Sequence, residues 1–337
     1  MSLIVADVGG TNARFAFQKN INSEICLIEN FLCSEFKSLE DIITAYKKKH
    51  NIINEHISIG VAGPCEDDDV ILSNNHIKFN KIQLLKNLNL KSLLVINDFV
   101  AQSFVFKNLL LEEDEEKYKI LFKKLKLKKI KNGTSKKNST LLVTGPGTGL
   151  GVCNLKKIDN NVIPIPGEGG NAYFSPSNKE QIEILNHLLK YQKYVSVEDL
   201  VSGRGIENLF NFYQNKNKGK NSKIKASEIA DLADKNDRNA ISAINQMYKI
   251  LVVSIINNIF LNGSLAGVII CGGISIKLQK FLNQDVFLNE FKKIDQYFDY
   301  LNDIPIYLCE NEINGLIGAK ECFHNSYFKK TYLIYNK

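Results

Sequence analysis

The stretch LIVADVGGTNARFAF, residues 3–17, holds the pattern around which the rest of the chain can be arranged. An apolar run leads to Asp7, a Gly-Gly-Thr-Asn segment follows, and a second alternating apolar run completes a predicted strand, turn and strand. Glycines lack a Cβ and tolerate positive φ, so this backbone can approach a ligand closely and its N–H groups can hold an anion. The residues predicted to bind the anion are Gly9, Gly10, Thr11 and Asn12. An ordinary hairpin has the same local pattern, so the meaning of this turn depends on the rest of the chain.

Length and composition favour a two-domain globular protein. The 337 residues exceed the roughly 250–300 at which single cores stop growing, and the 44% hydrophobic and 23% charged content is typical of soluble domains. The net charge of +7 depends largely on residues 123–137, which carry eight lysines and no acid, just after the acidic run at 112–116. We expect a solvated surface segment or domain boundary over 112–137. Because this segment lacks interleaved aromatic residues, we expect no nucleic-acid partner.

The cysteines and histidines indicate neither a disulfide framework nor a zinc site. The seven cysteines form no C-x-x-C pair, and the five histidines are isolated from one another. We see no signal peptide and no apolar run that approaches the roughly 20 residues of a membrane span. The sequence therefore predicts a cytoplasmic protein with no membrane partner.

Two carboxylates follow predicted strands. Asp7, at the end of the first strand, suits a hydrated Mg²⁺ ion, which usually takes one or two carboxylates and keeps several waters. Asp98 follows Asn97 after the buried strand at 92–96. A carboxylate there lies where α/β sheets bind ligands, but it also suits the N-cap of the helix predicted over 99–110. The two interpretations are not exclusive.

The opening pattern recurs about 135 residues later. A strand at 140–144 leads into the turn GPGTG at 145–149, and a return strand follows over 150–155. Two such hairpins indicate two related α/β domains, each with a phosphate-binding turn, although a chance recurrence is the alternative. The turn residues predicted to bind phosphate are Gly145, Gly147, Thr148 and Gly149.

Further glycine-rich turns follow in the second half of the chain. Glu168 is flanked by glycines in a predicted loop, and Ser202 is a candidate N-cap for a helix that begins beside Arg204. The pair Gly272-Gly273 forms a third close-approach turn after a strand. The patterns predict strands at 25–31, 57–62, 266–271 and 304–308, helices at 38–50, 81–88, 178–191, 226–233, 239–260 and 314–323, and a loop at 214–225.

The ordered set of motifs resembles the bacterial-type glucokinases, in the superfamily of hexokinase, actin and the seventy-kilodalton heat-shock chaperones. The resemblance covers nearly the whole chain, and the Walker pattern of P-loop proteins is absent. The segments that carry it are DVGGTNARFAF (7–17), INDFVAQ (96–102), TGPGTGLGV (144–152), PGEGGNAYFSP (166–176), VEDLVSGRG (197–205), GVIICGGI (267–274) and NGLIGA (314–319).

The resemblance implies a two-domain, ribonuclease-H-like (actin-like ATPase) α/β fold with a cleft between the domains. The small domain would comprise 1–108 and 312–337, and the large domain 109–311. The implied activity is ATP-dependent phosphorylation of D-glucose at the 6-hydroxyl, the first step of glycolysis, by a homodimer that uses ATP and Mg²⁺.

The resemblance also implies roles for single residues. The two hairpins would hold the ATP phosphates, Gly272 and Gly273 would lie beside the adenosine, and Asp7 would contact Mg²⁺ through water. Asp98 would be the general base for the 6-hydroxyl. The sugar-binding set would be Asn97, Asp98, Glu168, Asn171 and Glu198.

Two positions depart from the family pattern. Asn171 stands where the family usually has His, and Arg204 stands where it usually has Pro. Asn still donates and accepts hydrogen bonds, but it is shorter and cannot be protonated, so the change concerns sugar selectivity more than chemistry. One alternative is a catalytically weak, sugar-binding regulator of the same fold. Another is an actin-like or chaperone-like ATPase, which leaves Glu168 and Glu198 without a role.

Overall fold

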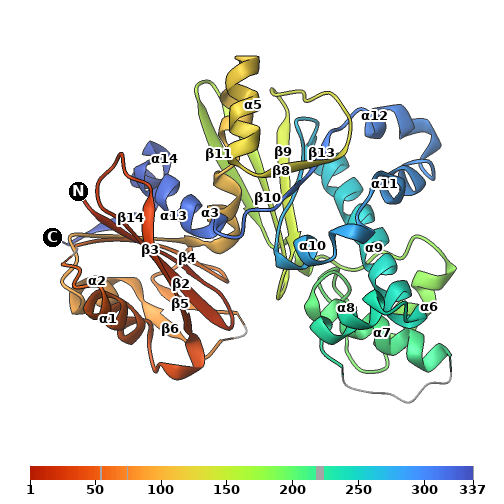
Figure 1. Cartoon of the computed structure of the whole chain (residues 1–337), viewed down its shortest axis with the longest axis horizontal. Coiled ribbons are helices and arrows are strands. Elements are labelled where there is room, and N and C mark those ends of the chain that lie inside the picture. The colour runs from red at the N-terminus through yellow and green to blue at the C-terminus, as the bar shows by residue number, and fades with distance from the viewer. Residues whose placement is uncertain (54, 74, 218–223, 337) are drawn as a thin grey trace. The chain divides into compact units, whose positions relative to one another are not determined.

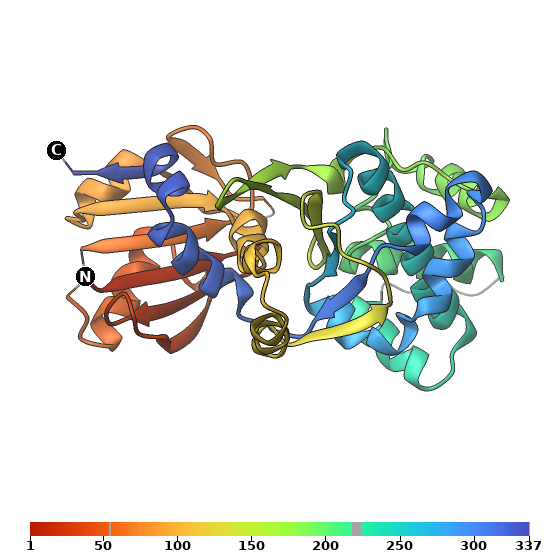
Figure 2. The ribbon, with the colours of Figure 1, turned by 90° about the horizontal axis from the view of Figure 1, so that it is seen from above.

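The computed structural model describes residues 1–53, 55–73, 75–217 and 224–336. The chain divides into two compact units, which we describe separately: unit 1 is Met1–Lys107 with Glu312–Lys337, and unit 2 is Asn108–Asn311. Each unit contains a six-stranded sheet of mixed strand direction with helices packed on it (Figures 1 and 2). The predicted α/β fold class is confirmed.

The sheet of unit 1 has the order β14-β7-β4-β1-β2-β3. Its strands are β1 (Leu3–Val8), β2 (Asn12–Gln18), β3 (Ile25–Leu32), β4 (His56–Val61), β7 (Ser92–Asn97) and β14 (Leu333–Tyr335), with β5 (Asp69–Ile71) and β6 (Lys78–Asn80) in a separate two-stranded sheet. Strands β1, β4 and β7 run parallel, whereas β2, β3 and β14 are antiparallel to their neighbours. The carboxyl ends of β1 and β7 therefore lie at the same edge.

Helices cover both faces of this sheet (Figure 1). They are α1 (Leu39–Lys49) and α2 (Lys81–Asn87) on one face, and α3 (Asp98–Phe104), α13 (Asn314–His324) and α14 (Ser326–Thr331) on the other. Alternate residues of β1, such as Ile4 and Ala6, share a buried cluster with Tyr46 of α1. On the opposite face, Ser58 of β4 donates a 2.7 Å hydrogen bond to the carbonyl of Ala319 in α13.

Helices α3 and α13 pack backbone against backbone at Gly318. A Cβ at this position would lie 1.7 Å from the carbonyl oxygen of Ala101, so only glycine allows the observed approach. This packing fixes α3, whose first residue is Asp98, on the sheet.

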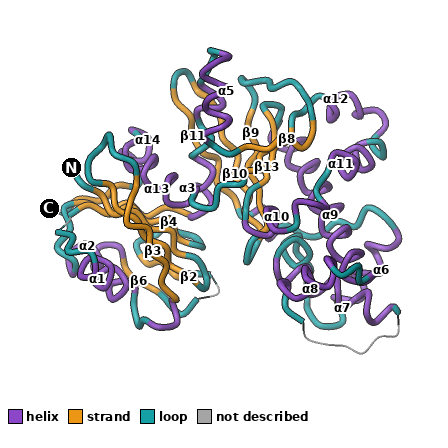
Figure 3. The backbone as a smooth tube through the Cα atoms, viewed as in Figure 1, coloured by secondary structure: helices purple, strands orange, loops and turns teal. Residues whose placement is uncertain are grey.

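The sheet of unit 2 has the order β11-β10-β9-β12-β13-β8. Figure 3 shows strands in orange and helices in purple. The strands are β8 (Leu127–Lys131), β9 (Thr140–Pro146), β10 (Leu150–Ile158), β11 (Asn161–Gly167), β12 (Gly267–Ile270) and β13 (Ile306–Cys309). The helices are α4 (Asn108–Leu111), α5 (Glu115–Lys124), α6 (Lys179–Leu188), α7 (Gly203–Lys216), α8 (Ala226–Asp234), α9 (Arg238–Asn262), α10 (Gly273–Lys277), α11 (Gln284–Phe291) and α12 (Phe298–Asn302).

Side-chain alternation on β13 shows how the helices divide between the two faces. Ile306 and Leu308 join the core cluster formed with α9 and its neighbours. Tyr307 points to the other face, where its ring contacts Phe122 of α5 at 4.9 Å between centroids. The unit thus has a helical layer on each side of its sheet.

Helix α9 is the central element of the core of unit 2. Asp237 caps its start by accepting from the N–H of Ala240, and Gly263 ends it with a φ of 62°. Among the described residues it is the one helix long and apolar enough to cross a membrane, with a mean hydropathy of 1.3 in its most apolar window. Its apolar side chains pack inside the core, which accounts for that composition.

The structure corrects three sequence expectations in unit 2 and at its border. The segment 112–137 is not simply a solvated excursion, because it contains α5 and the strand β8, which pairs with β13. Acids lie in the first turn of α5 and lysines in its last turn, which suits the helix dipole. The separation of charge along this segment therefore reflects the two ends of a helix. The helix predicted over 99–110 is divided into α3 and α4. The loop predicted over 214–225 begins later, because α7 continues to Lys216; residues 218–223 lie outside the described residues.

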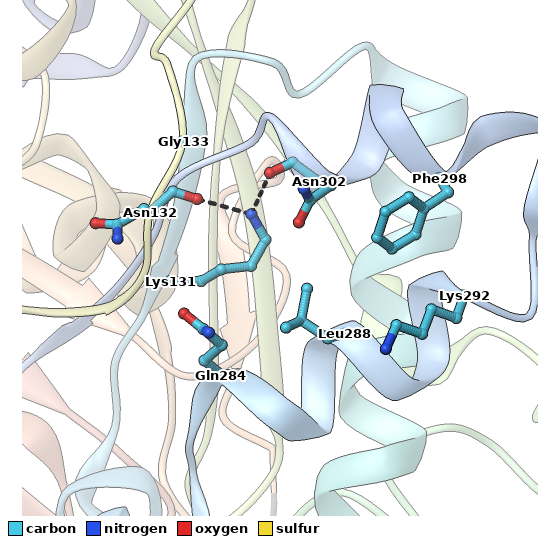
Figure 4. A pocket seen from close by; sticks show the side chains of 8 residues that line it. All are labelled: Lys131, Asn132, Gly133, Gln284, Leu288, Lys292, Phe298 and Asn302. Carbon is cyan, nitrogen blue, oxygen red and sulfur yellow. Dashed lines mark hydrogen bonds between the residues drawn. The ribbon is translucent and has the colours of Figure 1, made fainter.

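One lysine of that segment is buried and holds two stretches of chain together. The Lys131 ammonium donates to the carbonyl oxygens of Asn132 at 2.7 Å and Asn302 at 2.5 Å (Figure 4). It also donates to the carbonyl oxygen of Ile304 at 3.0 Å. These three bonds use all its donors. A cavity of about 410 Å³ lies beside it, with Leu288 and Phe298 in its wall, and none of the predicted site residues line it.

We expect Lys131→Met to destabilise unit 2 by about 2–3 kcal/mol, because the substitution leaves carbonyls without their charged donor. Thermal and urea unfolding followed by circular dichroism would measure the change. Lys129→Met, at an exposed position of the same strand, is the control and should change the stability by less than about 0.5 kcal/mol. Equal stabilities for the two variants would contradict this role for Lys131.

Candidate functional site

The turn between β1 and β2 is held by backbone bonds. The Gly9 N–H donates to the Asn12 carbonyl at 2.9 Å, and the Asn12 side chain accepts from Asn30 of β3 at 3.0 Å. Thr11 is exposed at the tip. Neither Gly9 nor Gly10 adopts a positive φ, so the expected use of that freedom is wrong here. What these glycines contribute is the absence of side chains at the tip of a turn between two buried strands.

Asp7 lies where β1 meets the first turn of α13. A Cβ on Gly315 would lie 2.3 Å from the Asp7 carboxylate, so glycine is required for this approach. Burial raises the pKa of Asp7 to about 6, and the nearby Arg14 guanidinium lowers it by a smaller amount. Arg14 is paired with Asp7 across β1 and β2, and it donates to the carbonyl of Glu312 at 2.6 Å. A cation beside Asp7 would therefore stabilise the ionised form of this carboxylate.

The structure decides which of the neighbours Asn97 and Asp98 caps helix α3. Asn97 is the N-cap of α3: its side-chain oxygen accepts from the N–H groups of Phe99 at 3.0 Å and Val100 at 3.1 Å. Its amide nitrogen donates to the Gly63 carbonyl at 3.3 Å. Asp98 is the first helical residue, so the alternative that made it the cap is wrong. Its Oδ1 accepts from the Phe99 N–H at 2.8 Å.

Parallel pairing brings Asp7 and Asp98 to one edge of the unit 1 sheet. Asp7 pairs with Gly60 of β4, and Gly60 pairs with Ile96 of β7, so Asp98 follows two residues beyond the level of Asp7. The two strands are separated only by β4, which corresponds to about 10 Å between their backbones. A ligand at this edge can meet both carboxylates.

The hairpin of unit 2 is tighter than predicted. Strand β9 continues through Pro146, so only residues 147–149 form the tip, where the Gly147 N–H donates to the Gly149 carbonyl at 2.7 Å. Thr148 is exposed at that tip. Gly145 therefore lies in a strand. Close packing requires glycine at this position, because a Cβ there would lie 2.2 Å from the carbonyl oxygen of Cys271.

The turn at Gly272 lies against the same hairpin. Gly272 has a φ of 95°, and a Cβ on it would lie 2.6 Å from the Pro146 carbonyl oxygen. The following Gly273 and the hairpin residue Gly147 line one cavity of about 260 Å³. The structure thus brings together two turns that the sequence separates by more than 120 residues. The other residues in the wall are Ile206, Ala226, Ser227, Ala230, Ile274, Lys277 and Leu278.

Sequence reasoning missed the residues that α7 and α8 contribute to this wall. Ile206 and Ala230 have the spacing of ordinary core positions, and they also belong to the core cluster of unit 2. No sequence signal distinguishes a core residue from one that also lines a cavity. Only the arrangement of the helices identifies them.

The residues predicted to bind sugar in unit 2 lie together beside the hairpin. Asn171 donates from its side chain to Glu168 Oε2 at 3.3 Å. The Glu198 N–H donates to the Gly170 carbonyl at 2.8 Å, and Glu198 Oε2 accepts from the Leu150 N–H at 2.8 Å. A Cβ on Gly149 would lie 2.3 Å from Glu198 Oε2, so the glycine permits this bond.

The start of α7 is connected to Glu198. Ser202 accepts from the Gly205 N–H at 3.0 Å, which confirms the predicted N-cap, and its hydroxyl donates to the Glu198 carbonyl at 2.8 Å. Arg204 reaches Asp199 at 3.0 Å and Glu198 at 3.7 Å. Among the described residues, no group of three or more His, Cys, Asp or Glu side chains could hold a metal ion by itself.

Comparisons with known proteins agree on one family. The sequence model described as Glucokinase matches residues 4–326. A curated glucokinase of Yersinia enterocolitica is 32% identical over 318 residues, which are 94% of each chain. A crystal structure of glucokinase from an Antarctic psychrotroph has a TM-score of 0.77 and 28% identity, covering 96% of this chain and 99% of that one.

A more distant structure shares the fold. The glucokinase of the ROK family from Streptomyces griseus, solved in complex with glucose and AMPPNP, has a TM-score of 0.62 and 16% identity, covering 95% of this chain and 98% of that one. The structural neighbours therefore place the chain among sugar kinases with the actin-like ATPase fold. The sequence match, which covers nearly the whole chain, identifies a narrower class than the fold does. The chain belongs to the glucokinase family, and it is a glucokinase-type enzyme.

The raised pKa of Asp7 makes a prediction about stability. The folded protein binds this proton more tightly than the unfolded chain, whose carboxyl has the usual value of 3.8. Ionisation therefore costs stability as the pH rises from about 4 to about 6, and the cost persists above that range. We expect Asp7→Asn to raise the stability of the ligand-free protein by about 2 kcal/mol at pH 7.5, with little difference near pH 4.

Urea unfolding of both proteins across this pH range would measure the difference, with Asp67→Asn, at an exposed acid, as the control. An Asp7→Asn variant that is less stable than the wild type at pH 7.5 would contradict the prediction.

Proposed function

We propose that this enzyme transfers the γ-phosphoryl group of ATP to the 6-hydroxyl of D-glucose, with Asp98 as the general base. The observation that carries the proposal is the position of Asp98, which begins α3 at the carboxyl edge of the unit 1 sheet, directly after the capping residue Asn97. Membership of the glucokinase family supports the reaction. The Streptomyces griseus structure, with its glucose and AMPPNP, supports the substrate pair.

In this proposal the sugar is bound by Asn97, Asp98, Glu168, Asn171 and Glu198. Carboxylates suit hydroxyl-rich ligands because each accepts several hydrogen bonds, and charge-assisted bonds are about twice as strong as neutral ones. The capping bonds of Asn97 hold the backbone that carries Asp98, so the base is positioned before the sugar binds. Units 1 and 2 would be the small and large domains of the kinase.

The nucleotide would occupy the glycine turns. The adenine would occupy the 260 Å³ cavity, in contact with the apolar side chains of Ile206 and Ile274. The phosphates would lie beside Gly147, which lines the same cavity. Gly9, Gly10, Thr11 and Asn12 in unit 1, and Gly145, Thr148, Gly149, Gly272 and Gly273 in unit 2, would complete the binding set.

Asp7 fits a magnesium ion held mainly by phosphate. Its carboxylate is partly buried beside one arginine, and it is ionised at neutral pH although its pKa is raised. A single carboxylate with waters and phosphates is a usual Mg²⁺ environment. When bound, the ion would neutralise phosphate charge during transfer.

The chemistry assigned to this chain is proton transfer and positioning. Phosphoryl transfer requires an oriented hydroxyl and stabilised phosphate charge more than covalent assistance. Asp98 would accept the proton of the 6-hydroxyl as the oxygen attacks phosphorus. Backbone N–H groups of the turns would stabilise the phosphate oxygens.

The main test is a coupled ADP-release assay of the purified protein with ATP and Mg²⁺. Glucose, mannose, fructose, glucosamine and galactose would be supplied in turn. We expect the highest kcat/KM with glucose. Failure to phosphorylate any of these hexoses would overturn the proposed function, whereas sugar-independent ADP release would favour an ATPase.

Asp98→Asn should lower kcat by about 10²–10⁴-fold while glucose binding, measured by calorimetry, is retained. The amide keeps an oxygen that can accept from the Phe99 N–H, so the start of α3 should persist. Asp67→Asn, at an exposed position, is the matched control and should be fully active. Turnover preserved in Asp98→Asn would show that another group is the base.

Asn171→His restores the usual family residue, and we expect it to lower the KM for glucose about two- to tenfold through one better hydrogen bond. Asn171→Ala should move the KM in the opposite direction, because it removes a side chain that also bonds Glu168. Steady-state kinetics over the same five sugars would measure both. Profiles identical to the wild type would show that position 171 does not set selectivity.

A further inference from the structure

Arginine is rare in this chain. Forty of the 43 basic residues are lysine, and the three arginines are Arg14, Arg204 and Arg238. Arg14 bonds the Glu312 carbonyl beside Asp7, and Arg238 is an exposed first residue of α9. Arginine differs from lysine by its planar fork of donors, which can address two acceptors at once. The position of Arg204 therefore needs a geometric explanation.

Arg204 bridges two neighbouring carboxylates. Its Nη2 lies 3.0 Å from Asp199 Oδ1 and 3.7 Å from Glu198 Oε1. The arginine side chain is 56% exposed, whereas those of Glu198 and Asp199 are 18% and 12% exposed. The cation thus covers two largely buried acids from the solvent side.

Each carboxylate is anchored through its other oxygen. Glu198 Oε2 accepts from the Leu150 N–H at 2.8 Å. Asp199 Oδ2 accepts from the Ser196 N–H and hydroxyl, both at 2.9 Å, and from Gln192 at 3.0 Å. Asp199 is therefore a fixed point for the Arg204 guanidinium, which also lies within ion-pair distance of the second oxygen of Glu198.

Helix stability does not explain an arginine here. Arg204 lies in the first turn of α7, where the helix dipole disfavours a cation, and Ser202 already supplies the N-cap. The favourable partners of the guanidinium are the two acids. Without it, adjacent carboxylates repel each other, and Glu198 Oε1 is the oxygen free to turn away.

We infer that Arg204 is a positioning residue for Glu198: held by Asp199, it orients the Glu198 oxygen that receives a sugar hydroxyl. This inference rests on the proposed function, because it takes Glu198 as a sugar-binding residue. It assigns a role to a position where the family usually has proline. Loss of the guanidinium weakens ground-state sugar binding and leaves the phosphoryl-transfer step unchanged.

The test compares Arg204→Met and Arg204→Lys with the wild type, and Arg238→Met is the control at an exposed arginine. We expect Arg204→Met to raise the KM for glucose about three- to fivefold, the size of an exposed ion-pair effect, with kcat within about 1.5-fold. The KM for MgATP should change less than the KM for glucose. Arg204→Lys keeps a positive charge but loses the guanidinium, whose Nη2 makes both contacts, so its KM should lie between the other two.

The outcomes separate the inference from the function on which it rests. A wild type that phosphorylates no hexose overturns both. An active wild type with an unchanged glucose KM in Arg204→Met overturns the inference alone. A lower kcat and melting temperature with the KM unchanged would show a merely structural role and also overturn it. Should Arg204→Met fail to fold, an unchanged KM in Arg204→Lys would still overturn it.

Discussion

The hydrogen bond from the Leu150 N–H to Glu198 Oε2 joins the hairpin of unit 2 to the segment that carries Glu198. It exists only because residue 149 has no side chain. The same rule of backbone approach repeats at Gly145 against Cys271 and at Gly272 against Pro146. Alanine at position 145 or 272 would clash with backbone and push the packed segments apart, whereas alanine at position 149 would displace the Glu198 side chain. Strand pairing and cavity walls alike depend on these missing Cβ atoms.

Unit 1 positions its polar residues in a different way. Its polar residues come from the ends of parallel strands rather than from a packed turn, so β-sheet register decides where Asp7 and Asp98 lie. The contact of Gly318 with Ala101 then fixes the helix that carries Asp98. Burial raises the pKa of Asp7 to about 6, so ionisation of this carboxylate at neutral pH costs folding free energy that a bound cation would offset.

Periodicity and turn chemistry predicted much of the fold. The two hairpins, the helix predicted at 239–260 and the Ser202 cap follow from local rules, and the structure confirms them. Long-range effects were not predictable. Lys131 is buried because carbonyl groups from a distant segment enclose it. The error at Asp98 is local: Asn97, one residue earlier, accepts from the N–H groups and is the cap. The roles assigned to single site residues stay predictions.

The double use of Glu198 has a thermodynamic consequence. One of its oxygens holds the turn proposed for phosphate, and the other is proposed to receive sugar. A ligand that binds the second oxygen and thereby alters the contact of the first with Leu150 makes the two binding equilibria interdependent. Linkage then requires the effect to be reciprocal: whatever factor glucose applies to nucleotide affinity, nucleotide applies to glucose affinity. In this arrangement, cooperativity between two substrates would need no second subunit and no distant effector, because one carboxylate would belong to both proposed sites.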